Sequence, residues 1–196
     1  MPFATDPESN LAILEAMVDE LEAYLESDDL FRQLVVQTDD KTYQPKMTLG
    51  LAIDHIETLK RDISTLRPAD RLRLEDAAKR YADVRGERFD PYAAKLRREM
   101  KSHLDSWTWF LDRCAEGDET CQDDYESEVW LRTRLEGLMR EARSGGIAAE
   151  AEEARLSEQD RRLDDMFRSG TYVGPREQEA EYPKPTFWWL YGKPMI

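Results

Sequence analysis

Apolar residues recur at steps of three and four along most of the chain, which is the spacing of one face of an α-helix. The clearest stripe runs from Leu49 to Leu66 without an irregular step. Because six such segments lie between stop signals, we expect six helices. Their approximate ranges are 7–25, 48–66, 68–84, 91–115, 120–143 and 148–168.

Capping residues support the ends of these helices. Asp6 is a favourable N-cap, and Pro7 suits the first helical position. Pro68 stops the second helix and can begin the third, because proline lacks the N–H that a helix interior requires. The run 144–146 (Ser-Gly-Gly) ends the fifth helix. The short apolar patch at 30–36 fits either a helical turn or a lone strand, and the pattern does not decide between them.

The composition changes after Gly170. Prolines at 183 and 185 favour an extended chain, and an aromatic run follows at 187–191. We therefore expect an all-α fold: a bundle of about six helices with an extended, proline-containing aromatic arm at the C-terminus. The expected division is a helical bundle over 1–170 and an arm over 171–196, packed on the bundle or on a partner.

Charge is abundant and unevenly distributed along the chain. The net charge is −14, with 36% charged residues, which suits helices whose outer faces are solvated. Residues 1–40 hold eleven carboxylates and one base, whereas residues 41–114 hold sixteen bases and twelve carboxylates. We therefore predict that the acidic first helix lies against the basic segment 71–101, where opposite charges offset its crowding.

Several classes of partner are disfavoured by this composition. Nucleic acid binding depends on clustered lysine and arginine, and the bases of segment 71–101 are interleaved with acids. No apolar run approaches the roughly 20 residues of a membrane span, and the first residues do not resemble a signal peptide. We therefore expect no nucleic acid partner, no membrane insertion and a cytoplasmic location.

Residues for catalysis or cofactor binding do not form a recognisable set. The chain lacks a Gly-x-Ser-x-Gly turn and the glycine clusters that hold phosphates. Glu99 and His103 share a helix face, His103 lies on an apolar stripe, and His55 lies at the flank of another. We expect no cofactor and no required metal, and the chemistry argues against an enzyme. A metal or small-ligand site of His55, Glu99 and His103 is the alternative.

Two cysteines, Cys114 and Cys121, flank the expected turn between the fourth and fifth helices. No second cysteine pair or histidine motif accompanies them, so their spacing is not that of a zinc site. We expect two reduced thiols. A disulfide across the turn is the alternative, if the protein meets an oxidising environment.

Two tryptophans lie on the polar sides of their helices. Trp109 is about 200° around its helix from the apolar stripe, and Trp130 is off the stripe of Leu131 and Leu135. A large indole is unfavourable in water, so we expect each to be covered by the chain's own tail, a second subunit or another protein. The candidate interaction residues are Trp109, Trp130, Phe187, Trp188, Trp189 and Tyr191.

The sequence thus favours a non-enzymatic interaction, adaptor or assembly protein that works through helical faces and the aromatic arm. A protein partner or self-association as a homodimer is the expected mode of action. The arm itself either pins the C-terminus to the bundle or inserts into a partner, with aromatic anchors as hot spots. We predict that Trp188 and Trp189 are packed and cover Trp109 or Trp130.

Overall fold

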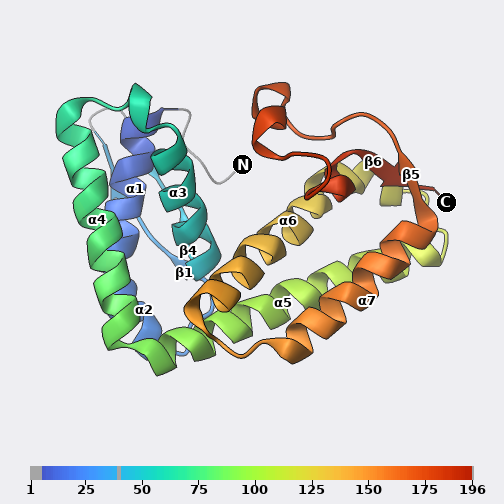
Figure 1. Ribbon diagram of the computed structural model, residues 1–196, viewed down its shortest axis with the longest axis horizontal. Helices are drawn as coiled ribbons and strands as arrows, with labels where there is room; N and C mark the ends of the chain where they lie inside the picture. Colours follow the sequence, from blue (N-terminus) through green and yellow to red (C-terminus); the bar gives the residue numbers. More distant parts are fainter. Residues whose placement is uncertain (1–5, 39–40, 196) are drawn as a thin grey trace. The chain divides into compact units, whose positions relative to one another are not determined.

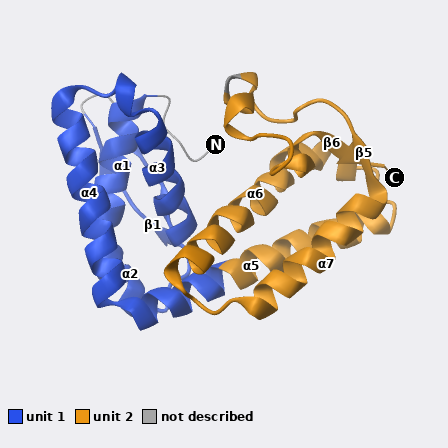
Figure 2. Cartoon of the chain, in the orientation of Figure 1, with its two compact units in different colours: residues 1–99 blue, residues 100–196 orange. Residues whose placement is uncertain are grey.

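The computed structural model describes residues 6–38 and 41–195, apart from the side chain of residue 177 (Figure 1). The chain forms two compact units, residues 1–99 and residues 100–196, which we call unit 1 and unit 2 (Figure 2). The boundary lies within one long helix. The division at residue 170 rests on the change of composition there, not on compactness, and it stays a prediction.

Unit 1 is built from four complete helices and the first part of a fifth. Two helices of this unit begin where the sequence indicates. Asp6 is the N-cap of the first, and its side chain accepts a hydrogen bond from the Ser9 amide at 2.7 Å. Pro68 is the first residue of the fourth. The elements are α1 (Pro7–Asp19), α2 (Leu21–Glu26), α3 (Leu49–Arg61), the 3₁₀ turn η1 (Ile63–Thr65), α4 (Pro68–Glu87) and the start of α5 (Phe89–Ala115).

The apolar patch at 30–36 forms short strands of a β-hairpin. Strand β1 (Arg32–Gln33) pairs with β4 (Lys46–Met47), and β2 (Val36–Gln37) pairs with β3 (Thr42–Tyr43), both antiparallel and in one continuous register. The ladder is interrupted near Pro45, which has no N–H to donate. The structure therefore shows neither a helical turn nor a lone strand here, but two short strands that each pair with a later one.

The core of unit 1 lies where α1, α3 and α4 pack side by side (Figure 1). Carboxylates of α1 form ion pairs with arginines of α4. Glu15 forms an ion pair with Arg73 at 2.6 Å, and Asp19 forms one with Arg80. The prediction that the acidic first helix lies against the basic middle segment is therefore confirmed.

Unit 2 contains the rest of α5, two further helices and the C-terminal arm. Helix α6 ends where predicted, at Gly146, whose φ of 66° is a left-handed conformation that favours glycine. The elements are α6 (Cys121–Gly145), α7 (Glu150–Met166), β5 (Phe167–Ser169), the 3₁₀ turns η2 (Arg176–Glu181) and η3 (Trp188–Leu190), and β6 (Gly192–Pro194).

Polar contacts join α7 to the outer side of α5. Arg155 pairs with Asp105 at 2.5 Å, and Arg162 pairs with Asp112 at 2.6 Å. The arm returns to the end of α7, because β6 pairs with β5 in antiparallel register. A side chain at Gly192 would clash with the carbonyl of Arg168, so the close approach of these strands requires glycine there.

All six predicted helical segments are helical, and the all-α prediction is confirmed. Two details differ. The first segment is divided at Glu20 into α1 and α2. The buried stripe of α6 includes Val129, Arg132 and Met139, whereas Leu131, which we placed on the stripe, is only half-buried. Because Arg132 is charged, its place in the buried stripe hides the helical spacing of the residues that face the core.

The core of unit 1 makes a direct prediction for stability. Leu14 is fully buried, whereas Leu72 on α4 is 67% exposed. We expect Leu14→Ala to lower the free energy of unfolding by about 2–5 kcal/mol through lost burial and a cavity. The matched change Leu72→Ala should alter it by less than about 0.5 kcal/mol. Urea unfolding followed by circular dichroism measures both, and equal effects would contradict this packing.

Candidate protein-interaction site

The C-terminal arm packs against α6 through Trp189, which is 2% exposed. Its indole Nε1–H donates to Oγ1 of Thr133 at 3.0 Å. The Tyr125 hydroxyl donates a hydrogen bond to the backbone carbonyl of Trp189 at 2.7 Å. Side chain and backbone of Trp189 are therefore both held by α6, and the arm docks on its own chain.

Arg132 lies beneath this tryptophan and is almost completely buried. Its guanidinium carbon is 3.6 Å from the centroid of the Trp189 ring. Its Nε and Nη2 donate to the two carboxylate oxygens of Asp160 on α7, at 2.6 and 2.8 Å, and Glu136 lies at 3.3 Å. A buried charge is costly unless it is paired, so α7 and the arm together make this position tolerable for arginine.

Trp130 is half-buried against the arm. The ring of Tyr182 meets it edge-on, with the centroids 5.5 Å apart. The ring of Phe187, which is buried, packs edge-on against Tyr182, with the centroids 5.1 Å apart. The indole that the sequence placed on the polar side is therefore covered in cis, by a tyrosine that we did not include among the candidate residues.

The remaining arm residues contact other parts of unit 2. Trp188 is half-buried, and its ring lies 5.1 Å from Phe167 at the end of α7 and 6.0 Å from Trp189. The Tyr191 hydroxyl donates to the backbone carbonyl of Tyr182 at 2.8 Å. Among the described residues, the ring contacts of Trp188 and Trp189 are with each other, Phe167 and Phe187. Neither ring contacts Trp109 or Trp130, the tryptophans that we expected them to cover.

Trp109 is the tryptophan that the described chain leaves open, with 59% of its surface exposed. Arg113, one turn later on α5, places its guanidinium 4.8 Å from the ring centroid. A shallow hollow lies beside the indole, between α5 and α6. We call its lining residues the Trp109 groove: Asp105, Ser106, Trp109, Glu128 and Leu131.

Two carboxylates of the groove differ in their electrostatic surroundings. Asp105 is paired with Arg155 at 2.5 Å, and this contact lowers the pKa of Asp105. Burial raises the pKa of Glu128, the charge of Asp124 raises it further, and Arg113 only partly opposes the shift. Within the described part of the chain, Glu128 has no hydrogen bond and no ion pair. The groove therefore presents one carboxylate, Glu128, that has no ion-pair partner among the described residues.

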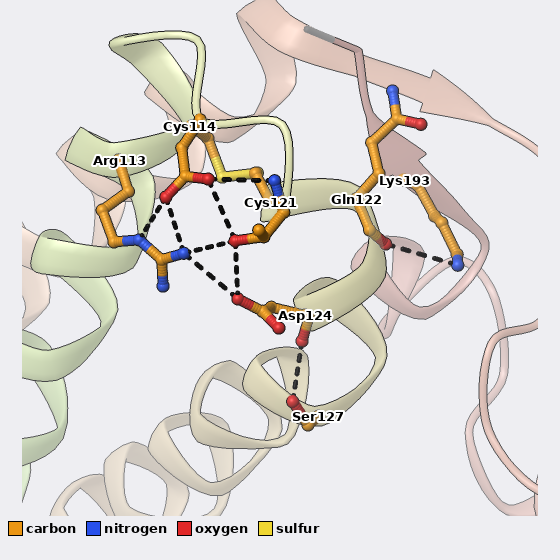
Figure 3. The surroundings of a disulfide bond; sticks show 9 residues. Arg113, Cys114, Cys121, Gln122, Asp124, Ser127 and Lys193 are labelled. Atoms are coloured by element: carbon orange, nitrogen blue, oxygen red, sulfur yellow. Dashed lines mark hydrogen bonds and ion pairs between the residues drawn. A yellow bond between two sulfur atoms is a disulfide. The ribbon is translucent and has the colours of Figure 1, made fainter.

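A disulfide between Cys114 and Cys121 closes the turn that joins the two groove helices (Figure 3). Arg113 braces the same turn: it donates to Asp118 at 2.8 Å, to Thr120 at 2.6 Å and to Asp124 at 3.1 Å. The side chain that lies over Trp109 is therefore anchored in the disulfide-closed turn.

The expectation of two reduced thiols is wrong for this structure. The Cα atoms of Cys114 and Cys121 are 5.3 Å apart, within the range that a disulfide spans. The turn brings them this close because Gly117 adopts a φ of 81°, which reverses the chain between α5 and α6. Linear spacing alone does not reveal that approach.

The residues of the alternative metal site have other structural surroundings. His55 is fully buried on α3 rather than at the flank of its stripe, and His103 is 7% exposed. The Glu99 carboxylate accepts hydrogen bonds from the backbone amides of Leu49 at 2.9 Å and Gly50 at 3.0 Å, so it caps the start of α3. Over residues 6–38 and 41–195, no group of three or more His, Cys, Asp or Glu side chains is arranged to hold a metal ion.

Comparison with known proteins found no matching family model, no matching characterised protein and no matching solved structure. Among the described helices, none is both long and apolar enough to cross a membrane. The class that the fold and the site define is an all-α protein with a self-docked aromatic arm and one open tryptophan groove.

Sequence reasoning missed three residues of this region: Arg132, Tyr182 and Glu128. Arg132 could have been found from the three- and four-residue steps that link it to Tyr125, Val129 and Leu135 on one helix face. The roles of Tyr182 and Glu128 depend on contacts between segments far apart in the sequence, and we find no local signal for them.

The different burial of two tryptophans gives a matched pair of substitutions. Trp189→Ala should lower the free energy of unfolding by about 3–5 kcal/mol, because it empties a filled site and removes the ring that lies against the guanidinium of Arg132. Trp109→Ala should change it by less than about 0.5 kcal/mol. Thermal and urea unfolding measure both. Comparable losses would show that Trp109 is covered in solution.

The disulfide predicts a response to reducing agents. In the loop-entropy model, opening a cross-link of this short span lowers the free energy of unfolding by about 2–3 kcal/mol. Melting with and without a phosphine reductant measures the loss, and the Cys114→Ala/Cys121→Ala variant, which has no disulfide, is the control. An equal effect of reductant on both proteins would contradict a cross-link between these residues.

Proposed function

We propose that this is a non-enzymatic interaction protein that binds a partner protein through the Trp109 groove. The observation that carries the proposal is the exposure of Trp109, while the chain covers Trp107, Trp130 and Trp189 itself. Tryptophan is among the residues most enriched at interaction hot spots. An open indole beside a hollow on two packed helices is the arrangement that a docking partner completes.

The size of the exposed indole supports this proposal. A buried aromatic side chain removes about 150–250 Å² from water, so covering the open part of Trp109 contributes roughly 2–4 kcal/mol at about 25 cal/mol per Å². That gain is comparable to a hot-spot residue. Because α5 and α6 pack against each other through the rings of Trp107, Phe110 and Tyr125, the groove is pre-organised and little ordering entropy opposes binding.

The arm plays a structural part in this proposal. Trp189 and Phe187 are buried on their own unit, so an arm released to bind a partner would first lose these contacts. Of the candidate interaction residues, Trp109 is therefore the one that we propose contacts the partner. A protein is favoured over nucleic acid because the groove presents carboxylates and the indole rather than clustered bases.

The predicted cytoplasmic location is tested by the redox state of the cysteines. Disulfides persist in oxidising compartments and are rare in the cytosol. Thiol alkylation in intact producing cells, followed by mass spectrometry, distinguishes reduced Cys114 and Cys121 from the cross-linked pair. Recovery of the cross-linked pair would contradict a reducing cytoplasmic location.

Site-specific photo-crosslinking tests the proposed surface. A photoreactive phenylalanine analogue replaces Ser106, an exposed residue of the groove lining, in the producing cells, so that Trp109 stays in place. The same analogue at Leu72, which is also exposed, is the control. We expect a discrete adduct from position 106 and none above background from position 72. An adduct of twice the chain mass would identify a second copy as the partner. Absence of any position-specific adduct would contradict the proposal.

A further inference from the structure

The Trp109 groove has two chemically different walls. Trp109 on α5 and Leu131 on α6 supply apolar surface. Glu128 lies one helical turn before Leu131, so its carboxylate lies on the same face of α6. An occupant that fills this hollow must therefore satisfy an indole, an aliphatic side chain and a carboxylate together.

The carboxylate is the feature that selects the occupant. Neighbouring acids have counter-charges: Asp105 has Arg155 at 2.5 Å, and Asp124 has Arg113 at 3.1 Å. Glu128 is half-buried, and among the described residues it forms no ion pair: the charge of Arg113, which is engaged with Asp124, only partly offsets the effects that raise its pKa. If a neutral apolar segment covered the groove, it would remove water from Glu128 and leave an unpaired buried charge, which is strongly unfavourable.

We infer that the docking segment of the partner protein carries a lysine or arginine whose cationic head pairs with Glu128 and whose aliphatic stem lies on Trp109 and Leu131. Such side chains lay their methylene groups on apolar surfaces while the charged end reaches a polar partner. A cation near an indole gains further from the negative face of the ring. This inference rests on the proposed function and specifies its partner.

The charge of the surrounding unit favours the same occupant. Residues 100–196 hold twenty-one carboxylates and thirteen lysines and arginines. This excess attracts a basic segment over several ångströms and speeds its encounter. A second copy of the chain, with a net charge of −14, is repelled by the same field. A basic partner therefore fits the groove better than self-association does.

The free protein provides a readout that a merely structural role for Glu128 would not give. Because burial and Asp124 raise its pKa, the folded state holds the proton more tightly than the unfolded state. Removing the ionisable carboxylate removes this unfavourable contribution to folding, so Glu128→Gln should leave the melting temperature unchanged or raise it. Binding should weaken in the same variant. A structural carboxylate would lose stability instead.

The test uses a phage-displayed random peptide library selected on the wild-type chain. Peptides that bind through the groove are those that lose binding to the Trp109→Ala variant, and synthetic copies are then titrated by calorimetry. We expect these peptides to be enriched in lysine and arginine beside apolar residues. Their affinity should fall about tenfold with Glu128→Gln, as expected for a hydrogen-bonded charged group.

Matched variants separate the local pair from the general field. Glu126→Gln removes the same charge from an exposed position of α6 and should weaken binding by less than about twofold. Glu128→Lys should reject the basic peptides and select acidic ones. The inference is overturned, while the proposed function stands, if Trp109-dependent peptides are not basic or bind Glu128→Gln as well as the wild type. If no selected peptide depends on Trp109, both are overturned.

Discussion

The buried guanidinium of Arg132 is the interaction on which the second unit depends. It stacks at 3.6 Å on Trp189 of the arm and pairs with Asp160 of α7. A charge taken out of water needs a partner in close geometry, so α6 can bury this arginine only when both other segments are in place. Three segments distant in the sequence are thereby joined at one side chain.

This arrangement determines which aromatic residues remain for other molecules. The arm is held on α6 and brings Tyr182 over Trp130, so the tail's aromatic residues serve the fold. Trp109 lies on the polar side of α5, where the guanidinium of Arg113 lies over its ring and 59% of the residue's surface stays exposed. The candidate interface therefore results from where the arm docks.

The disulfide connects this groove to the turn beside it. Arg113 contacts Trp109 on one side and residues of the turn, including Asp118, on the other. The cross-link between Cys114 and Cys121 fixes the ends of that turn. The position of the guanidinium over the indole is thus supported by a covalent bond in the adjacent loop, which links the shape of the groove to the redox state of the cysteines.

Much of the fold could be predicted from the sequence because its information is local. Stripe periodicity and caps such as Asp6 and Gly146 locate the helices, and charge asymmetry correctly placed the first helix against the basic segment. The disulfide, the burial of Arg132 and the cover of Trp130 by Tyr182 depend on tertiary approach, which no local pattern records. Of the candidate site, Trp109 could be found by its helical angle, whereas Glu128 could not.

The central claim is that Trp109 alone is left open for a partner, and fluorine NMR tests it most directly. Incorporating 5-fluorotryptophan gives one resonance for each of the five tryptophans, and Trp109→Phe assigns the relevant one. The account predicts that this resonance shows the largest shift when H₂O is replaced by D₂O, while those of Trp107 and Trp189 show almost none. A protected Trp109 in the isolated protein, or an exposed Trp189, would contradict it.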